Sequence, residues 1–281
     1  MIDIKHLQSW IGCQQVVEDP LPVFPARALA AALSREQLPE QGDSLPPSWH
    51  WLHFLETPSG SGTGVDGHPL KGGFLPPVPL PRRMWASGQL QIEQPLSIGV
   101  PAQRQSRVAT VELKEGRSGS LVFVTLEHLL FQRGECRIRE LQHLVYRDAP
   151  SAAAPLPPGQ LPVAESQWER VLNADPVLLF RFSALTYNAH RIHYDRDYAM
   201  QEEFYPGLVV QGPLLATSLL ELAIEHTAPD AVRDFEFRAM RPTFAPGPIR
   251  LCGRRDGQQL QLWSLDQDGF VGMSARATVR N

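Results

Sequence analysis

Alternating apolar and polar residues occur in two separate parts of the chain, and they predict β-strands in both. In the first part, four strand-like runs follow one another across Gly or Pro turns, with no helical pattern between them. They are QLQIEQPL (89–96), RQSRVATVELKEG (104–116), SGSLVFVTLEHLLF (118–131) and ECRIRELQHLVYR (135–147). Strands that are joined directly by turns favour an antiparallel sheet.

The second part of the chain repeats this arrangement. The apolar run PVLLFRFSALT (176–186) is interpreted as a strand, and four further strands are predicted toward the C-terminus. Those four are DFEFRAM (234–240), IRLCGRR (249–255), QLQLWSL (259–265) and FVGMSARATV (270–279). We therefore expect a second antiparallel sheet.

Each part also contains one predicted helix. PARALAAALSREQL (25–38) is rich in Ala and has Pro25 near its start, and GPLLATSLLELAIEHT (212–227) has Pro213 in its first turn. The leucines of the second helix cover more than one face, so this helix should be wrapped by a sheet. The predicted fold class is α+β, with two halves that are each an antiparallel sheet curled around a central helix.

Proline-rich segments divide the chain. GGFLPPVPLPRRMWASG (72–88) predicts a long loop or an extended arm, whereas DAPSAAAPLPPGQLP (148–162) is almost uncharged and is typical of an interdomain linker. We therefore predict an N-terminal half (1–148), a linker (149–163) and a C-terminal half (164–281). The length of 281 residues is sufficient for two domains.

Composition narrows the choice of partners and compartment. A net charge of -4 without basic clusters argues against a nucleic-acid partner. Cys13, Cys136 and Cys252 are widely spaced and odd in number, which favours free thiols in a reducing compartment. No apolar run reaches the length of a signal peptide or a membrane span, so we expect a cytoplasmic protein that does not enter the membrane.

The segment FSALTYNAHRIHYDRDYA (182–199) concentrates the residues that could carry chemistry. A metal site of His190 and His193 with Asp195 is one interpretation, but ligands three residues apart converge best on a helix, and no helical periodicity is present here. We therefore predict no metal. A polar surface loop is a second interpretation, which the apolar run before the segment and the apolar helix after it make less suitable.

The third interpretation is a catalytic site. The helix predicted at 212–227 begins shortly after this segment, and its N-terminus presents free backbone N–H groups that can stabilise an oxyanion. A histidine base beside an oxyanion hole is sufficient for chemistry next to a carbonyl group.

The same residues resemble the hydratase motif of MaoC-like, hot-dog-fold (R)-specific enoyl-CoA hydratases. Phe182, Leu185 and Thr186 match the start of that motif, and Ile192, His193 and Ala199 match its end with the spacing kept. The chain departs from the motif at four positions, because Tyr187, Asn188, His190 and Arg191 replace Gly, Asp, Asn and Pro.

Longer stretches are similar to one subgroup, that of mesaconyl-C4-CoA hydratase, itaconyl-CoA hydratase and mitochondrial-type 3-hydroxyacyl-thioester dehydratase. These are the extension of the motif to YPGLVVQGPL (205–214), GHPLKGGFLPPVPLPRRMWASG (67–88) and EGRSGSLVFVTLEH (115–128). The resemblance implies a double hot-dog with one active site in the C-terminal half and a degenerate N-terminal half. It also implies an acyl-CoA substrate and homo-oligomers.

The resemblance assigns the catalytic role to His193, while Asn188 occupies the position of the catalytic Asp. An amide can orient a water molecule but cannot take its proton, so we expect Asn188 to position water and His193 to act as acid and base, with Asp195 as a further candidate. The backbone N–H of Gly212 is the expected oxyanion donor. Arg82, Arg83, Arg191 and Tyr187 are candidates for binding the substrate, either at the phosphates of CoA or, for the arginines, at a substrate carboxylate.

The expected activity is therefore hydration of an α,β-unsaturated CoA thioester, with a C5-dicarboxylyl-CoA such as itaconyl-CoA or mesaconyl-C4-CoA as substrate and no cofactor. Three alternatives stay open at this point. They are a 3-hydroxyacyl-thioester dehydratase of fatty-acid metabolism, a hot-dog thioesterase, and an acyl-CoA-binding module without catalysis.

Overall fold

A computed structural model of the chain describes residues 2–116, 119–150, 152–153, 155–156, 158–228 and 230–280. The strands are β1 (Gln14–Asp19), β2 (Arg82–Ile92), β3 (Ala102–Gly116), β4 (Gly119–Gln132), β5 (Glu135–Arg147), β6 (Trp168–Ala174), β7 (Leu208–Val209), β8 (Val232–Ala239), β9 (Phe244–Ala245), β10 (Gly247–Asp256), β11 (Gln259–Leu265) and β12 (Val271–Val279). The α-helices are α1 (Ile4–Gln8), α2 (Val23–Ala32), α3 (Pro176–Leu185) and α4 (Gly212–Glu225). Shorter helical turns are η1 (Trp49–Leu52), η2 (Gly60–Gly62), η3 (Arg191–His193) and the π-helical η4 (Tyr198–Glu202).

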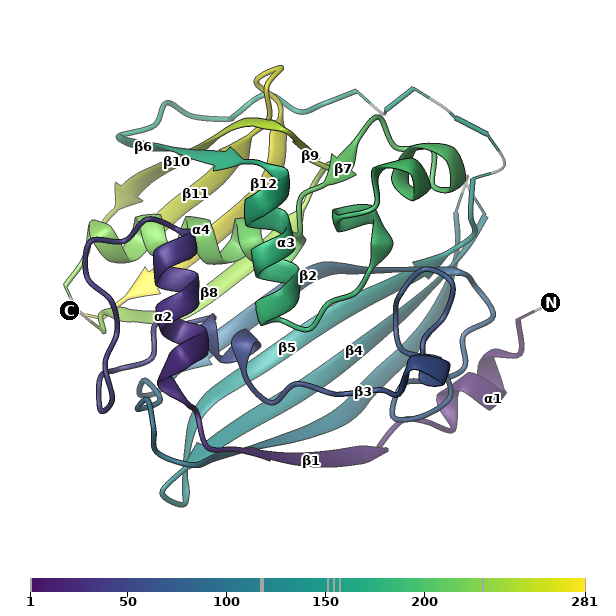
Figure 1. Cartoon of the computed structure of the whole chain (residues 1–281), viewed down its shortest axis with the longest axis horizontal. Coiled ribbons are helices and arrows are strands. Elements are labelled where there is room, and N and C mark those ends of the chain that lie inside the picture. The colour runs from purple at the N-terminus through teal and green to yellow at the C-terminus, as the bar shows by residue number, and fades with distance from the viewer. Residues whose placement is uncertain are drawn as a thin grey trace.

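One ten-stranded antiparallel sheet runs through the whole molecule (Figure 1). Its order is β1-β3-β4-β5-β2-β8-β12-β11-β10-β6, so five strands of the N-terminal half are followed by five of the C-terminal half. The halves join where β2 pairs with β8, with Gly88 opposite Phe237. The two sheets expected from the sequence are therefore continuous through one pair of strands.

The C-terminal half has the expected sheet around a helix. Helix α4 packs against β8, β10, β11 and β12, and every residue from Leu214 to Ala223 is buried. The apolar residues around the whole circumference of α4 therefore all find partners. The helix predicted at 212–227 is confirmed, as are the four strands that close the chain.

The helix of the N-terminal half has a different position. Helix α2 is shorter than predicted and packs beside α3 and η1, at one end of the N-terminal strands (Figure 1). Ser106, Leu126 and Gln142, on β3, β4 and β5, instead face a cavity. This half therefore leaves part of its sheet surface available for a ligand.

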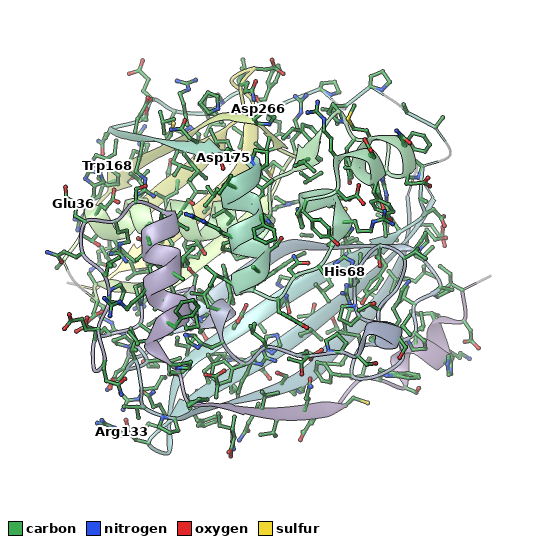
Figure 2. All side chains as sticks on the ribbon, viewed as in Figure 1. Glu36, His68, Arg133, Trp168, Asp175 and Asp266 are labelled. Atoms are coloured by element: carbon green, nitrogen blue, oxygen red, sulfur yellow. The ribbon has the colours of Figure 1, made fainter. Side chains whose placement is uncertain are left out.

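The prediction of a strand at 176–186 is wrong, because this run forms α3. Asp175 caps the helix by accepting a hydrogen bond from the backbone N–H of Leu178 at 2.7 Å, and it lies at the start of α3 in Figure 2. Leu178, Leu179 and Phe182 form the buried face. A short apolar run does not distinguish a buried strand from a helix that is apolar on several faces.

The two proline-rich segments have different outcomes. The arm predicted at 72–88 is wrong after residue 81, because β2 begins at Arg82 and pairs with β5. Between β5 and β6 the described residues contain no helix or strand, and residues 151, 154 and 157 of the predicted linker lie outside the described residues. The boundary between two domains in this segment stays a prediction.

No helix in the described part of the chain has the length and apolar character needed to cross a membrane.

The seam between the halves can be tested at Gly88. A Cβ atom at this position would lie 2.7 Å from the ring of Phe237, which is buried. We expect Gly88→Ala to lower the free energy of unfolding by about 1–3 kcal/mol, as in overpacked cores. Chemical denaturation measures this, with Gly60→Ala as the control because nothing lies within 4 Å of a Cβ at Gly60. Equal free energies of unfolding for the two variants would contradict the close packing of Gly88 against Phe237.

Candidate active site

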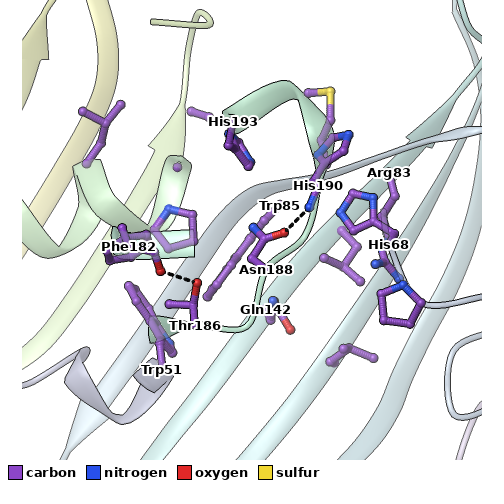
Figure 3. Close-up of a pocket in the computed structure, with 18 of the residues that line it drawn as sticks. Trp51, His68, Arg83, Trp85, Gln142, Phe182, Thr186, Asn188, His190 and His193 are labelled. Carbon is purple, nitrogen blue, oxygen red and sulfur yellow. Dashed lines mark hydrogen bonds between the residues drawn. The ribbon is translucent and has the colours of Figure 1, made fainter. Parts of the chain in front are cut away.

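A cavity of about 600 Å³ lies between the halves. Residues of both halves line it, and they are mostly apolar or aromatic, with Trp51 and Trp85 from the N-terminal half and Phe182 and Val210 from the C-terminal half. This size and lining are typical of small-molecule sites. Figure 3 shows the polar residues that converge on the cavity beside these aromatic rings.

The chain turns sharply after α3 and so delivers its polar residues to the cavity. Thr186 Oγ1 donates to the carbonyl of Phe182 at 2.8 Å (Figure 3). The backbone N–H of Asn188 donates to the carbonyl of Ser183 at 2.8 Å. Tyr187 adopts a left-handed conformation with φ of +50°. This is the position where the motif has Gly, and a left-handed backbone explains that preference.

His193 is buried against the backbone of β7. Its Nδ1 lies 2.7 Å from the carbonyl oxygen of Val209. A carbonyl can only accept, so Nδ1 carries the hydrogen and Nε2 keeps its lone pair. Burial lowers the pKa of His193 to about 4, although the hydrogen bond to Val209 opposes this shift. The imidazole is therefore neutral at physiological pH and can accept a proton.

Asn188 has one of its polar groups already engaged. Its Oδ1 accepts a hydrogen bond from the backbone N–H of His190 at 3.0 Å (Figure 3). The side-chain NH₂ can donate to a further partner, and the oxygen has a second lone pair. Asn188 lines the cavity together with His193.

The start of α4 also lines the cavity. Gly212 is the first residue of the helix, and Pro213 follows it without an N–H. Gln211 precedes them but does not cap the helix, because its side-chain NH₂ donates to Leu179 and Ser183 of α3 at 2.9 Å each. Among the described residues, the N–H of Gly212 has no hydrogen-bond partner. A free N–H at a helix N-terminus is suited to stabilise an oxyanion.

Four of the predicted site residues do not line the cavity. Asp195 accepts hydrogen bonds from Arg191, at 2.7 and 3.0 Å, and from the backbone N–H of Tyr198. Arg82 is buried and forms an ion pair with Glu203. Tyr187 is exposed. Asp195, Arg191 and Arg82 thus hold the local structure together.

Arg83 is the one of the three predicted arginines that lines the cavity (Figure 3). It forms no ion pair with any residue that the structure describes. Arg104 and Arg241 also line the cavity, although no sequence pattern distinguishes them from the other arginines. They lie on the N-terminal strand β3 and after β8, far in sequence from the motif.

The tryptophan and histidine residues of the segment WHWLHFL (49–55) form the wall of the cavity and the core beside it. Trp49 is fully buried, whereas His50, Trp51 and His53 line the cavity. Glu140, on β5, accepts hydrogen bonds from His50 at 2.9 Å and from Trp51 at 3.0 Å. This buried network fixes the wall of the cavity next to Trp85.

Two residues of a distant loop, Asp66 and His68, were not predicted from the sequence. Asp66, His68 and His190 offer one ligand atom each within 4.8 Å of one another, and His68 and His190 line the cavity. His193 does not belong to this group, so the pair considered from the sequence is not the one that the fold assembles. Asp66 and His68 lie more than 110 residues before the motif, and no local pattern connects them to it.

The fold and the cavity define a class of protein. An antiparallel sheet around a helix, joined through a central strand pair to a second such sheet, is the architecture of double hot-dog proteins. The structure of a MaoC-like dehydratase from Phytophthora capsici is similar, with a TM-score of 0.71 over 99% of both chains and 11% identity. A Mycobacterium tuberculosis protein described as having a double hotdog fold matches with a TM-score of 0.57 over 96% of both chains and 12% identity. The expected fold is confirmed.

The sequence gives the more specific assignment. The model of the hydroxyacyl-thioester dehydratase type 2 family matches residues 48–245, and the chain belongs to this family. A mesaconyl-C(4)-CoA hydratase from Chloroflexus aurantiacus is 46% identical over 95% of both chains. The prediction of a hydro-lyase is thereby confirmed.

Proposed function

We propose that this protein adds water to an unsaturated CoA thioester that also carries a free carboxylate, such as mesaconyl-C4-CoA or itaconyl-CoA. The observation that carries this proposal is that His193, Asn188 and Gly212, the first residue of α4, line one cavity. The 46% identity to a mesaconyl-C(4)-CoA hydratase supports the choice of substrate.

His193 is the general base of the proposed reaction. Its neutral imidazole has a lone pair on Nε2, because the hydrogen on Nδ1 is held by the carbonyl of Val209. A water molecule bound beside Nε2 loses a proton to it as the water oxygen attacks the β-carbon. The depressed pKa keeps His193 in the accepting form over most of the physiological range.

Negative charge develops on the thioester oxygen during this attack. The unpartnered N–H of Gly212 and the positive end of α4 stabilise that charge. Asn188 holds the water: its oxygen is already bound to the His190 N–H, so its NH₂ is the group that remains to donate to the water oxygen. An amide in this position orients the nucleophile without competing for its proton.

Arg83 binds the free carboxylate of the substrate. It lies in the cavity close to the imidazoles and has no ion-pair partner among the described residues. A guanidinium can bind a carboxylate through two parallel hydrogen bonds. Arg82 and Arg191, which were also candidates, are engaged with Glu203 and Asp195 and serve to fix the loops around the site.

We further infer that the enzyme works without a cofactor, in the cytoplasm, and as a homo-oligomer. The three cysteines are free thiols, which suits a reducing compartment. A dehydratase of 3-hydroxyacyl thioesters is the second candidate, because the family is named for that reaction. Hydration and dehydration are the two directions of one equilibrium, so the acyl group distinguishes the candidates.

A panel of substrates tests the proposal. The rate of hydration is measured for mesaconyl-C4-CoA, itaconyl-CoA, crotonyl-CoA and longer enoyl-CoAs, with the native enzyme and with His193→Ala. We expect the dicarboxylyl-CoA thioesters to have the highest kcat/KM, and His193→Ala to lower it by roughly 10²–10⁴-fold without unfolding the protein. Preference for long enoyl-CoAs would instead support the dehydratase, and an active His193→Ala enzyme would rule out the assignment of the base.

The role of Arg83 predicts a change in specificity. Removing a hydrogen bond between charged groups costs about 1.5–3 kcal/mol, so Arg83→Ala should lower kcat/KM for a dicarboxylyl-CoA by roughly ten- to a hundredfold. Crotonyl-CoA has no free carboxylate and is therefore the control substrate. The control variant is Arg276→Ala, at an exposed site on β12. A similar loss for both substrates would mean that Arg83 does not contact the carboxylate.

A further inference from the structure

The loop of residues 64–68, in the N-terminal half, lies directly against the segment that leads to His193. The backbone N–H of Arg191 donates to the carbonyl of Asp66 at 2.9 Å, and its guanidinium donates to the carbonyl of Val65 at 3.1 Å. Within the loop, the N–H of Gly64 donates to the carbonyl of His68 at 2.8 Å. Arg191 thus anchors this loop to the motif.

Gly67 allows the two segments to approach each other so closely. Its φ is +87°, and a Cβ atom there would lie 1.8 Å from the carbonyl oxygen of Ala189. No other residue type fits both the backbone conformation and the space. The loop is therefore shaped to place His68 beside His190.

Asp66 and His68 form a hydrogen-bonded pair. His68 Nδ1 lies 2.9 Å from Asp66 Oδ2, and the backbone N–H of His68 donates to Oδ1 at 3.0 Å. Burial raises the pKa of Asp66, but the hydrogen bonds from His68 and the charge of its imidazole outweigh burial and lower this pKa to about 2. The carboxylate can only accept, so Nδ1 of His68 carries a hydrogen and Nε2 is the atom free to exchange a proton.

Three imidazoles then form a row along the cavity. The ring centroids of His68 and His190 are 4.0 Å apart, and those of His190 and His193 are 5.4 Å apart (Figure 3). Burial, together with the two neighbouring imidazoles, lowers the pKa of His190 to about 2. The middle ring is therefore uncharged, and the two outer rings are the ones that can exchange protons.

We propose that His68, positioned by Asp66, is the second acid–base residue of the active site and exchanges the proton at the α-carbon of the substrate. This inference rests on the proposed hydratase function. It supplies the group that a single neutral base lacks, because hydration needs both an acceptor for the proton of water and a donor to the α-carbon. The N-terminal half would thereby provide the carboxylate that is missing at position 188.

Neutral His193 takes a proton from water at Nε2, and the water oxygen forms a bond to the β-carbon. The π electrons of the C=C bond shift onto the thioester oxygen, and they form the new C–H bond when the α-carbon takes the proton from Nε2 of the His68 imidazolium. The site is then left with its proton on His193, and one proton transfer back to His68 restores it.

The surroundings of the two histidines decide where a single proton resides. Burial lowers the pKa of His68, and Arg83 and Lys71 act in the same direction, but the hydrogen bond and the charge of Asp66 oppose this shift. The hydrogen-bond partner of His193 is instead a neutral carbonyl, which carries no charge to stabilise an imidazolium. His190 lies between them and stays neutral. A site that holds one proton on this pair therefore holds it on His68, which is the form that hydration requires.

The same three side chains could instead bind a metal ion, since Asp66, His68 and His190 lie within 4.8 Å. The direct hydrogen bond between Asp66 and His68 favours the acid–base pair, because a metal would have to replace it or bind at Nε2 alone. The two possibilities give different results with a chelator.

The experiment measures kcat/KM for hydration as a function of pH, with the substrate that the native enzyme prefers. The variants are His68→Gln and the isosteric Asp66→Asn, and His6→Gln is the control because His6 is exposed and outside the cavity. We expect a bell-shaped profile for the native enzyme, with an acid limb near pH 4 from His193 and an alkaline limb as His68 loses its proton.

His68→Gln should lower kcat/KM by about 10²-fold or more and abolish the alkaline limb, while thermal unfolding stays unchanged. Asp66→Asn should shift the alkaline limb to lower pH, because the carboxylate no longer stabilises the imidazolium. His6→Gln should behave as the native enzyme.

One outcome would overturn the role of His68 and leave the hydratase function unaffected. In that outcome His193→Ala is inactive, but His68→Gln has the same kcat/KM and the same pH profile as the native enzyme. Loss of activity with EDTA that zinc restores would overturn the role of His68 in favour of a metal site. A native enzyme that hydrates no enoyl-CoA would remove both proposals.

Discussion

The pairing of β2 with β8 is the interaction on which the rest of the structure depends. It makes one sheet from two halves, and it brings Gly88 and Phe237 into contact at the seam. Because the halves are fixed to each other, Trp85 and Arg83 of β2 can face the turn that follows α3 across a single cavity. Side chains of both halves therefore line the same cavity, although more than 100 residues separate them in the sequence.

Burial sets the chemistry of this cavity. It lowers the pKa of His193, His190 and His68 alike, so the imidazoles favour their neutral forms unless a charged partner opposes this effect. Asp66 opposes this effect at His68 through a direct hydrogen bond and at His190 through its charge. Asn188, which replaces a carboxylate in the motif, keeps a negative charge away from His193 and holds the turn through the His190 N–H. The site therefore combines a neutral imidazole at His193 with a separate carboxylate at Asp66.

The sequence predicted much of this arrangement, since strands, α4 and the residues around His193 follow from local periodicity and from one motif. It failed where a decision depended on distant partners. Residues 176–186 contain an apolar run that suits a strand, and only the Asp175 cap reveals the helix. Arg191 and Asp195 are four residues apart and pair locally, which their spacing could have indicated. Asp66 and His68 could not be found, because only the folded loop, with Gly67 against Ala189, brings them to the site.

The central claim is that the cavity between the halves adds water across a C=C bond and leaves the thioester intact. Incubation of the protein with mesaconyl-C4-CoA in ¹⁸O-labelled water, followed by mass spectrometry, tests this most directly. The account predicts an intact CoA thioester that has gained one molecule of labelled water, with ¹⁸O in a hydroxyl group at the β-carbon. Release of free CoA with ¹⁸O in the carboxylate of the acid would contradict it, because that product requires a thioesterase.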